Sequence, residues 1–104
     1  MDLNIENNIN NFDDFIKKPI HVRVQQQGRR KITIIQDLES DLDLKRICKN
    51  MKKIFSCNGC VVEDEKLGEI IQLQGNQSDN VKLWLINNEI INSNEVDRII
   101  IHGI

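Results

Sequence analysis

The stretch Gly68-Glu69-Ile70-Ile71-Gln72-Leu73-Gln74-Gly75 places a short apolar segment between two glycines. Its length is typical of a strand and too short for a helix, so it predicts a strand at 69–74. Ile71 and Leu73 are the expected core residues of this strand. On its amino-terminal side, residues 60–63 predict another short strand, which follows an Asn58-Gly59 turn.

Further toward the amino terminus, a second pair of strands is predicted. Residues 20–25 (Ile-His-Val-Arg-Val-Gln) alternate strictly between apolar and polar, which is the pattern of a half-buried strand. Residues 32–36 form the next one. The connection between them contains Gly28 and then Arg29, Arg30 and Lys31, so we expect a β-hairpin with a basic tip.

Two helices are predicted from helical spacing of apolar residues. The first starts near Ser40 or Asp41, either of which could cap it, and a second helix starts near Ser78 or Asp79. The first apolar stripe contains Leu44, Ile47, Cys48, Met51, Ile54 and Phe55. The second contains Val81, Trp84 and Leu85, extended by Leu83, Ile86 and Ile90.

A final strand at 98–101 is apolar enough to be buried on both faces. The order β-β-α-β-β-α-β then predicts an α+β fold of two layers, in which two helices cover one face of a mostly antiparallel five-stranded sheet. Residues 1–19 are acidic and Asn-rich and are expected to form a flexible tail, and residues 20–104 the single domain.

The formal net charge of −2 conceals an uneven distribution, because 9 of the 14 Lys and Arg residues lie between positions 23 and 53. Lys45, Lys49 and Lys52 share one stripe of the first helix, and Arg46 and Lys53 widen it. Such a stripe could bind phosphates or could simply be a solvated surface. The absence of a signal-like amino terminus and of a long apolar run favours a cytoplasmic protein without a membrane segment.

No catalytic, metal-binding or cofactor-binding constellation is evident. Cys57 and Cys60 have C-x-x-C spacing but lack a second ligand pair, so we expect Cys48 and Cys60 to be small core residues. His21 and His102 are interpreted as structural or surface residues. The few aromatic residues argue against stacking on single-stranded bases, whereas the lysines and arginines suit docking to structured RNA.

Four segments together resemble eukaryotic translation initiation factor 1 of the SUI family. They are Ile20-His21-Val22-Arg23, then Phe55-x-Cys57-Asn58-Gly59, then the opening stretch 68–75, and Ile101-His102-Gly103. The resemblance covers residues 20–104 in order. Phe12-Asp13-Asp14-Phe15 resembles an element found in the tails of eukaryotic members.

This resemblance implies a non-enzymatic factor, monomeric off the ribosome, that binds the small ribosomal subunit (18S-type rRNA) near the P site and promotes scanning and start-codon selection. The implied rRNA-binding residues are Arg29, Arg30, Lys31, Lys45, Lys49, Lys52 and Lys53. The loop Gly75, Asn76, Gln77 and Ser78 would lie close to initiator tRNA, and Phe12 and Phe15 would contact other initiation factors.

Two departures from the family pattern bear on these sites. The hairpin is one residue shorter than usual, and Asn76 and Ser78 stand where Asp and a basic residue are common. Two other readings stay open at this point. One is a module of the same fold that acts in recycling or reinitiation, and the other is a small thiol or metal protein built on Cys57 and Cys60.

Overall fold

The computed structural model describes residues 18–103, and within them the predicted order of elements is confirmed. The strands are β1 (Ile20–Gln27), β2 (Arg30–Gln36), β3 (Gly59–Asp64), β4 (Gly68–Gln74) and β5 (Ile99–His102). The helices are α2 (Leu44–Phe55) and α3 (Ser78–Asn87), followed by the short 3-10 segment η1 (Ser93–Arg98), which the sequence pattern did not predict. Phe12 and Phe15 lie outside the described residues.

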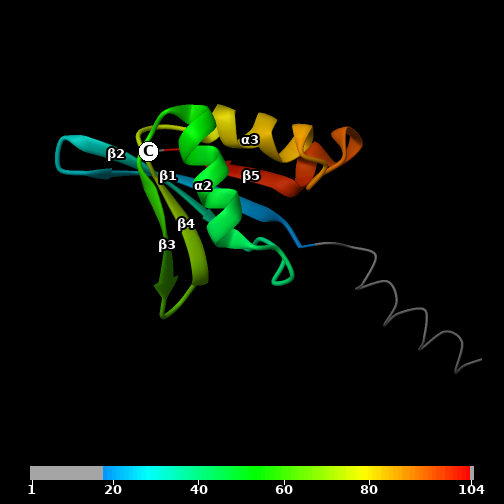
Figure 1. The fold of residues 1–104 in the computed structure, drawn as a ribbon, viewed down its shortest axis with the longest axis horizontal. Helices are drawn as coiled ribbons and strands as arrows, with labels where there is room; N and C mark the ends of the chain where they lie inside the picture. The colour runs from blue at the N-terminus through cyan, green and yellow to red at the C-terminus, as the bar shows by residue number, and fades with distance from the viewer. Residues whose placement is uncertain (1–17, 104) are drawn as a thin grey trace, which may run out of the picture.

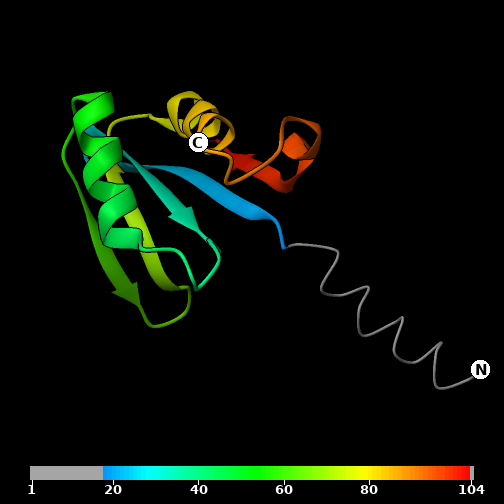
Figure 2. The same cartoon turned by 45° about the vertical axis from the view of Figure 1, so that its right-hand side comes forward.

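The strands form one mixed sheet with the order β3-β4-β2-β1-β5. Three of its pairings are antiparallel and only β1 with β5 is parallel, so the predicted mostly antiparallel sheet is confirmed. Helices α2 and α3 lie on the same side of the sheet (Figures 1 and 2). The strand predicted from the opening stretch, β4, is held between β3 and β2, which makes it interior to the sheet.

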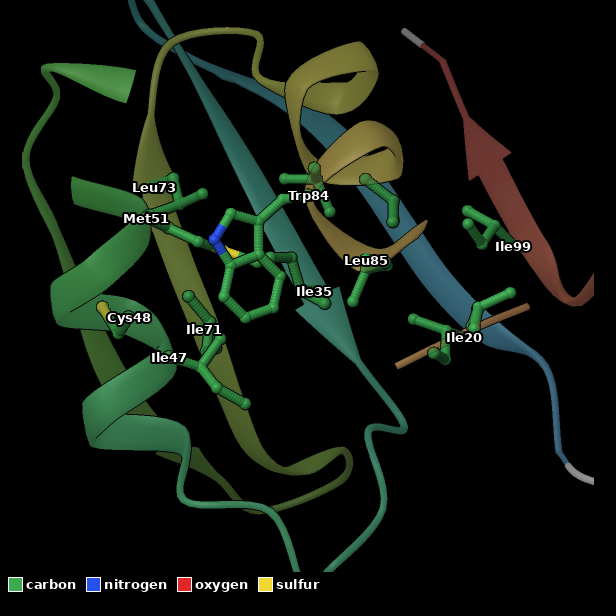
Figure 3. Close-up of a cluster of buried hydrophobic side chains, with 13 residues drawn as sticks. Ile20, Ile35, Ile47, Cys48, Met51, Ile71, Leu73, Trp84, Leu85 and Ile99 are labelled. Carbon is green, nitrogen blue, oxygen red and sulfur yellow. The ribbon is translucent and has the colours of Figure 1, made fainter. Parts of the chain in front are cut away.

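The main core fills the space between the sheet and the two helices (Figure 3). Ile71 and Leu73 of β4 are fully buried there, as predicted, beside Met51 of α2 and Leu85 of α3. The indole of Trp84 packs into the same cluster, and its N–H donates to the side-chain oxygen of Asn50 at 2.8 Å. The polar end of this large side chain is therefore satisfied while its apolar body adds to the core.

Helix α2 starts later than predicted. Its N-cap is Asp43, whose side chain accepts the backbone N–H of Arg46 at 3.2 Å, and not Ser40 or Asp41. All of these residues suit a cap, so composition alone did not separate them. The prediction for α3 was closer, because that helix begins at Ser78.

Several predicted core positions are wrong. Ile54 and Leu83 are 59% and 57% exposed, because each lies at the margin of its helix stripe. Ile100 and Ile101 are also exposed, since β5 is an edge strand with a single neighbour. Cys48 is buried, as expected, but Cys60 is exposed.

Candidate nucleic-acid interface

The β1–β2 hairpin presents the basic tip that the sequence predicts. Gln27 pairs with Arg30, which leaves Gly28 and Arg29 as a two-residue turn. Gly28 has φ +62°, a conformation that glycine adopts without a side-chain clash. Arg29, Arg30 and Lys31 are all exposed, and Figure 1 shows the hairpin extending beyond the rest of the sheet.

The cations of α2 do not form a single stripe. Lys52 lies toward β3, where its Cγ would be 3.4 Å from a Cβ placed at Gly59. Arg46, Lys49 and Lys53 line a groove of about 620 Å³ between α2 and α3, whose floor includes Trp84. The helix therefore offers positive charge on two flanks, and Lys52 and Lys53 in its last turn also favourably face the carbonyl end of the helix dipole.

The loop Gly75–Ser78 is tied to the hairpin at Lys31. The N–H of Gly75 donates to the carbonyl oxygen of Lys31 at 2.7 Å, one residue beyond the paired Ile32 and Gln74. Two of the predicted sites, the hairpin tip and the loop, are thus neighbours at one end of the sheet. No short-range pattern in the sequence indicates this, because the two segments are more than 40 residues apart.

Within this loop, Asn76 and Ser78 contact each other. The hydroxyl of Ser78 donates to the Asn76 side-chain oxygen at 2.8 Å, and the Ser78 backbone N–H approaches the same oxygen at 3.2 Å. Gln77 donates its side-chain amide to the carbonyl oxygen of Gln74 and accepts from the amide of Asn80. The two residues that depart from the family pattern therefore stabilise the loop itself.

Acidic groups gather at the opposite end of the molecule. Asp37, Glu39, Asp43 and Glu69 line one hollow between the β2–α2 connection and the β3–β4 turn. Lys45 lines the same hollow and lies in the first turn of α2, two helical turns from Lys52. Lys45 is therefore the member of the predicted basic set that the structure places among carboxylates, away from the hairpin.

The face of the sheet opposite the helices carries the two histidines. His21 Nδ1 and His102 Nε2 are 3.0 Å apart, and the rings stack with centroids 5.2 Å apart. Partial desolvation, the charge of Arg23 and the neighbouring His21 together lower the pKa of His102 below its ordinary value. Arg23 itself donates to the side-chain oxygen of Gln36 at 2.9 Å, so this cluster holds β1 against both of its neighbours.

The thiols give no sign of a reactive or metal-binding site. All three cysteines are free, and burial raises the pKa of Cys48 and of Cys57, which keeps both as unreactive thiols. Within residues 18–103, no group of three or more His, Cys, Asp or Glu side chains could hold a metal ion. The same residues contain no helix long and apolar enough to cross a membrane.

The family model for translation initiation factor SUI1 matches residues 16–91, well over half of the chain. This chain belongs to the SUI1 family of translation initiation factors. It is similar to Eukaryotic translation initiation factor eIF1 of Drosophila melanogaster, with 39% identity over 89% of this chain and 83% of that protein.

Plant members of the SUI1 family are also similar. Protein translation factor SUI1 homolog 2 of Arabidopsis thaliana is 43% identical over 84% of this chain and 75% of its own length. The homolog from Salix bakko is 46% identical with the same coverage. The SUI1 chain described here therefore has a role in translation initiation, and its family is one of initiation factors and not of enzymes.

A solved structure supports the SUI1 fold. The C-terminal domain of human eIF2D superposes with a TM-score of 0.65 at 19% identity, covering 81% of this chain. This chain spans less than half of that structure, 45%. The likeness concerns the fold alone at this level of identity.

Sequence reasoning missed one residue that supports the candidate loop from inside the SUI1 fold. Thr33 is fully buried in β2, where a polar residue stands among isoleucines, and its hydroxyl contacts the loop. The signal that could have found it is a polar residue within the otherwise apolar run of residues 32–35, since buried hydroxyls nearly always have hydrogen-bond partners.

Proposed function

We propose that this SUI1 protein binds the small ribosomal subunit near the P site and there promotes scanning and start-codon selection. The observation that carries the proposal is the hydrogen bond between Gly75 and Lys31, which joins the loop to the basic hairpin. A surface with cations for rRNA phosphates and a firm loop beside them suits a factor that occupies a site where RNA strands meet.

The cations of the hairpin and of α2 supply the affinity in this proposal. Arg29, Arg30 and Lys31 reach rRNA at the tip, and Lys49, Lys52 and Lys53 bind it along the helix. Each phosphate contact releases counterions, so binding weakens as salt rises. Lys45 contributes less than the other lysines, because the carboxylates around it reduce the positive potential there.

The loop 75–78 supplies the selectivity. Placed close to initiator tRNA, it would oppose full accommodation of the tRNA until a start codon is paired. A ligand shifts such an equilibrium only through its different affinity for the two states. The factor therefore stabilises the open, scanning-competent subunit and leaves the closed one, without covalent chemistry.

The proposal also covers where the protein acts and what its amino-terminal tail contacts. The protein acts in the cytoplasm as a monomer until it binds the subunit. Phe12 and Phe15 contact other initiation factors. The sequence similarity to proteins named as initiation factors over most of their length supports this assignment.

A charge-matched pair of triple variants tests the RNA face. Lys49/Lys52/Lys53→Ala removes three cations from α2, and Lys18/Lys66/Lys82→Ala removes three from elsewhere. Binding to purified small subunits is measured against salt concentration. The first variant should reduce the magnitude of the slope of log K against log salt by about 2 to 3, because each lost phosphate contact removes about 0.7–0.9. The second variant should leave the slope unchanged.

Equal behaviour of the two triple variants would contradict the proposed RNA face. A reconstituted initiation assay that compares AUG with near-cognate codons tests the selective role. We expect the wild-type protein to lower near-cognate initiation selectively. Subunit binding with no effect on codon choice would instead support the alternative role in recycling or reinitiation.

A further inference from the structure

The side chain of Thr33 lies where three parts of the molecule meet. It is in the middle of β2, fully buried, and its hydroxyl reaches across to the connection between β4 and α3. The hydroxyl donates to the carbonyl oxygen of Gly75 at 2.7 Å and accepts the backbone N–H of Gln77 at 2.8 Å. One side chain therefore satisfies backbone groups on both sides of Asn76, the exposed residue of the loop.

Both backbone groups would otherwise lack a partner within the strand and helix patterns. Gly75 lies one residue beyond the last paired residue of β4, Gln74, and has φ +85°, so its carbonyl oxygen is outside the β2–β4 pairing. Gln77 is the N-cap of α3, and its N–H precedes the hydrogen bonds of that helix. Both bonds end on the fully buried Thr33 hydroxyl, where an unpaired donor or acceptor is costly, so they hold the loop strongly.

The hydroxyl also sets the position of α3. The carbonyl oxygen of Gln77 accepts the N–H of Val81 at 2.8 Å, which is the first turn of the helix. The N–H of the same residue is bonded to Thr33, so the start of α3 is fixed relative to β2. The tip residues Arg30 and Lys31 are the first residues of β2, and the carbonyl oxygen of Lys31 accepts the N–H of Gly75.

We infer that Thr33 is the positioning residue that makes the basic hairpin and the loop 75–78 one rigid unit. The inference rests on the proposed function for its consequence on codon choice. When the hairpin is docked, the height of Asn76 above the decoding site is set by the Thr33 hydroxyl. Without it, the hairpin still binds and Gly75 stays bonded to Lys31, but Gln77 and the start of α3 no longer hold their place.

The test compares Thr33→Val, which keeps the shape of the side chain but removes the hydroxyl, with Thr33→Ser, which keeps the hydroxyl but removes the methyl group. Ile35→Val is the matched control, because it trims a fully buried residue of the same strand and the same sheet face, whose aliphatic side chain can make no hydrogen bond to the loop. Two readouts are recorded on the full chain: amide hydrogen exchange at Gln77, and initiation at AUG and near-cognate codons.

We expect exchange at Gln77 to quicken roughly tenfold or more in Thr33→Val, because the loop opens without unfolding of the core. Exchange at the buried Met51 of α2, corrected for global stability, stays as in the wild type. Subunit affinity is unchanged, near-cognate initiation rises severalfold, and Thr33→Ser and Ile35→Val behave like the wild type in both readouts.

The inferred link between Thr33 and the loop is wrong if exchange at Gln77 is unchanged in Thr33→Val. It is also wrong if exchange at Gln77 is as fast in Thr33→Ser as in Thr33→Val. Faster exchange with unaltered codon choice, in an assay where the wild type is selective, would overturn its positioning role. If the wild type itself has no effect on codon choice, the proposed function fails. The exchange data still show whether the Thr33 hydroxyl holds the loop.

Discussion

Gly59 offers a sharp test of how tightly β3 is packed against β4. It is the first residue of β3 and pairs with Leu73, and its φ does not lie in the left-handed region. Glycine is therefore not needed there for backbone conformation. A Cβ at this position would lie 2.7 Å from the carbonyl oxygen of Gln72 and 2.7 Å from Cδ2 of Leu73.

Neither neighbour of that Cβ can easily move. The Gln72 oxygen belongs to the backbone of an interior strand, and Leu73 is fully buried in the main core. Overpacking of this kind costs about 1–3 kcal/mol, whereas replacing glycine by alanine recovers about 0.4–1 kcal/mol by restricting the unfolded chain. The expected net loss for Gly59→Ala is about 1–2 kcal/mol of unfolding free energy.

Thermal unfolding followed by circular dichroism measures this loss. For a domain of this size, Tm should fall by about 5–15 °C. Gly103→Ala is the control, because a Cβ there meets no atom within 4 Å and its φ is not positive, so its Tm should match the wild type. A Gly59→Ala protein that melts within about 1 °C of the wild type would refute the packing argument.

Three further outcomes are expected. Asp43→Ala should cost about 1 kcal/mol in urea unfolding by removing the α2 cap, and Ser40→Ala less than about 0.5 kcal/mol; equal losses would contradict the assigned cap. Because the pKa of His102 is lowered in the folded state, the unfolded chain binds more protons below pH 6.5. Stability should thus be full above that pH and decline as pH falls toward the lowered pKa, and His102→Gln should flatten this dependence in urea midpoints recorded from pH 5 to 8. An aromatic disulfide reagent should modify the exposed Cys60 well before the buried Cys48, whose pKa is raised, so Cys60→Ser should lose the fast phase of the reaction.

The element order was predictable because each strand and helix carries its own periodic signal. Residues 20–25 alternate along β1, and the apolar spacing of α2 marks the buried Ile47, Cys48 and Met51. Burial at the margins was not predictable in the same way. Whether Ile54 or Ile101 is covered depends on which element lies beside it, and that is a property of the tertiary arrangement and not of the local pattern.

The candidate site was predicted in parts but not as a whole. Arg29, Arg30 and Lys31 form the expected tip, and residues 75–78 the expected loop. Their contact depends on the register of β2 with β4 and on a side-chain hydrogen bond between residues 42 positions apart. No short-range periodicity encodes such a bond, and the division of the α2 lysines between two flanks likewise emerges only with α3 in place.

The parallel pairing of β1 with β5 has a consequence for how the chain folds. Ile20 pairs with Ile99, so the sheet closes a loop of about 80 residues, at an entropic cost of roughly 4 kcal/mol. On the translating ribosome, β1 can pair with β2 on one side early, but its other side is covered only after residues 99–102 have emerged. We expect β5 to dock late, so that weakening this pair speeds unfolding far more than it slows folding. A protein that acts at the start of synthesis would thus finish its own sheet only near the end of the chain described here.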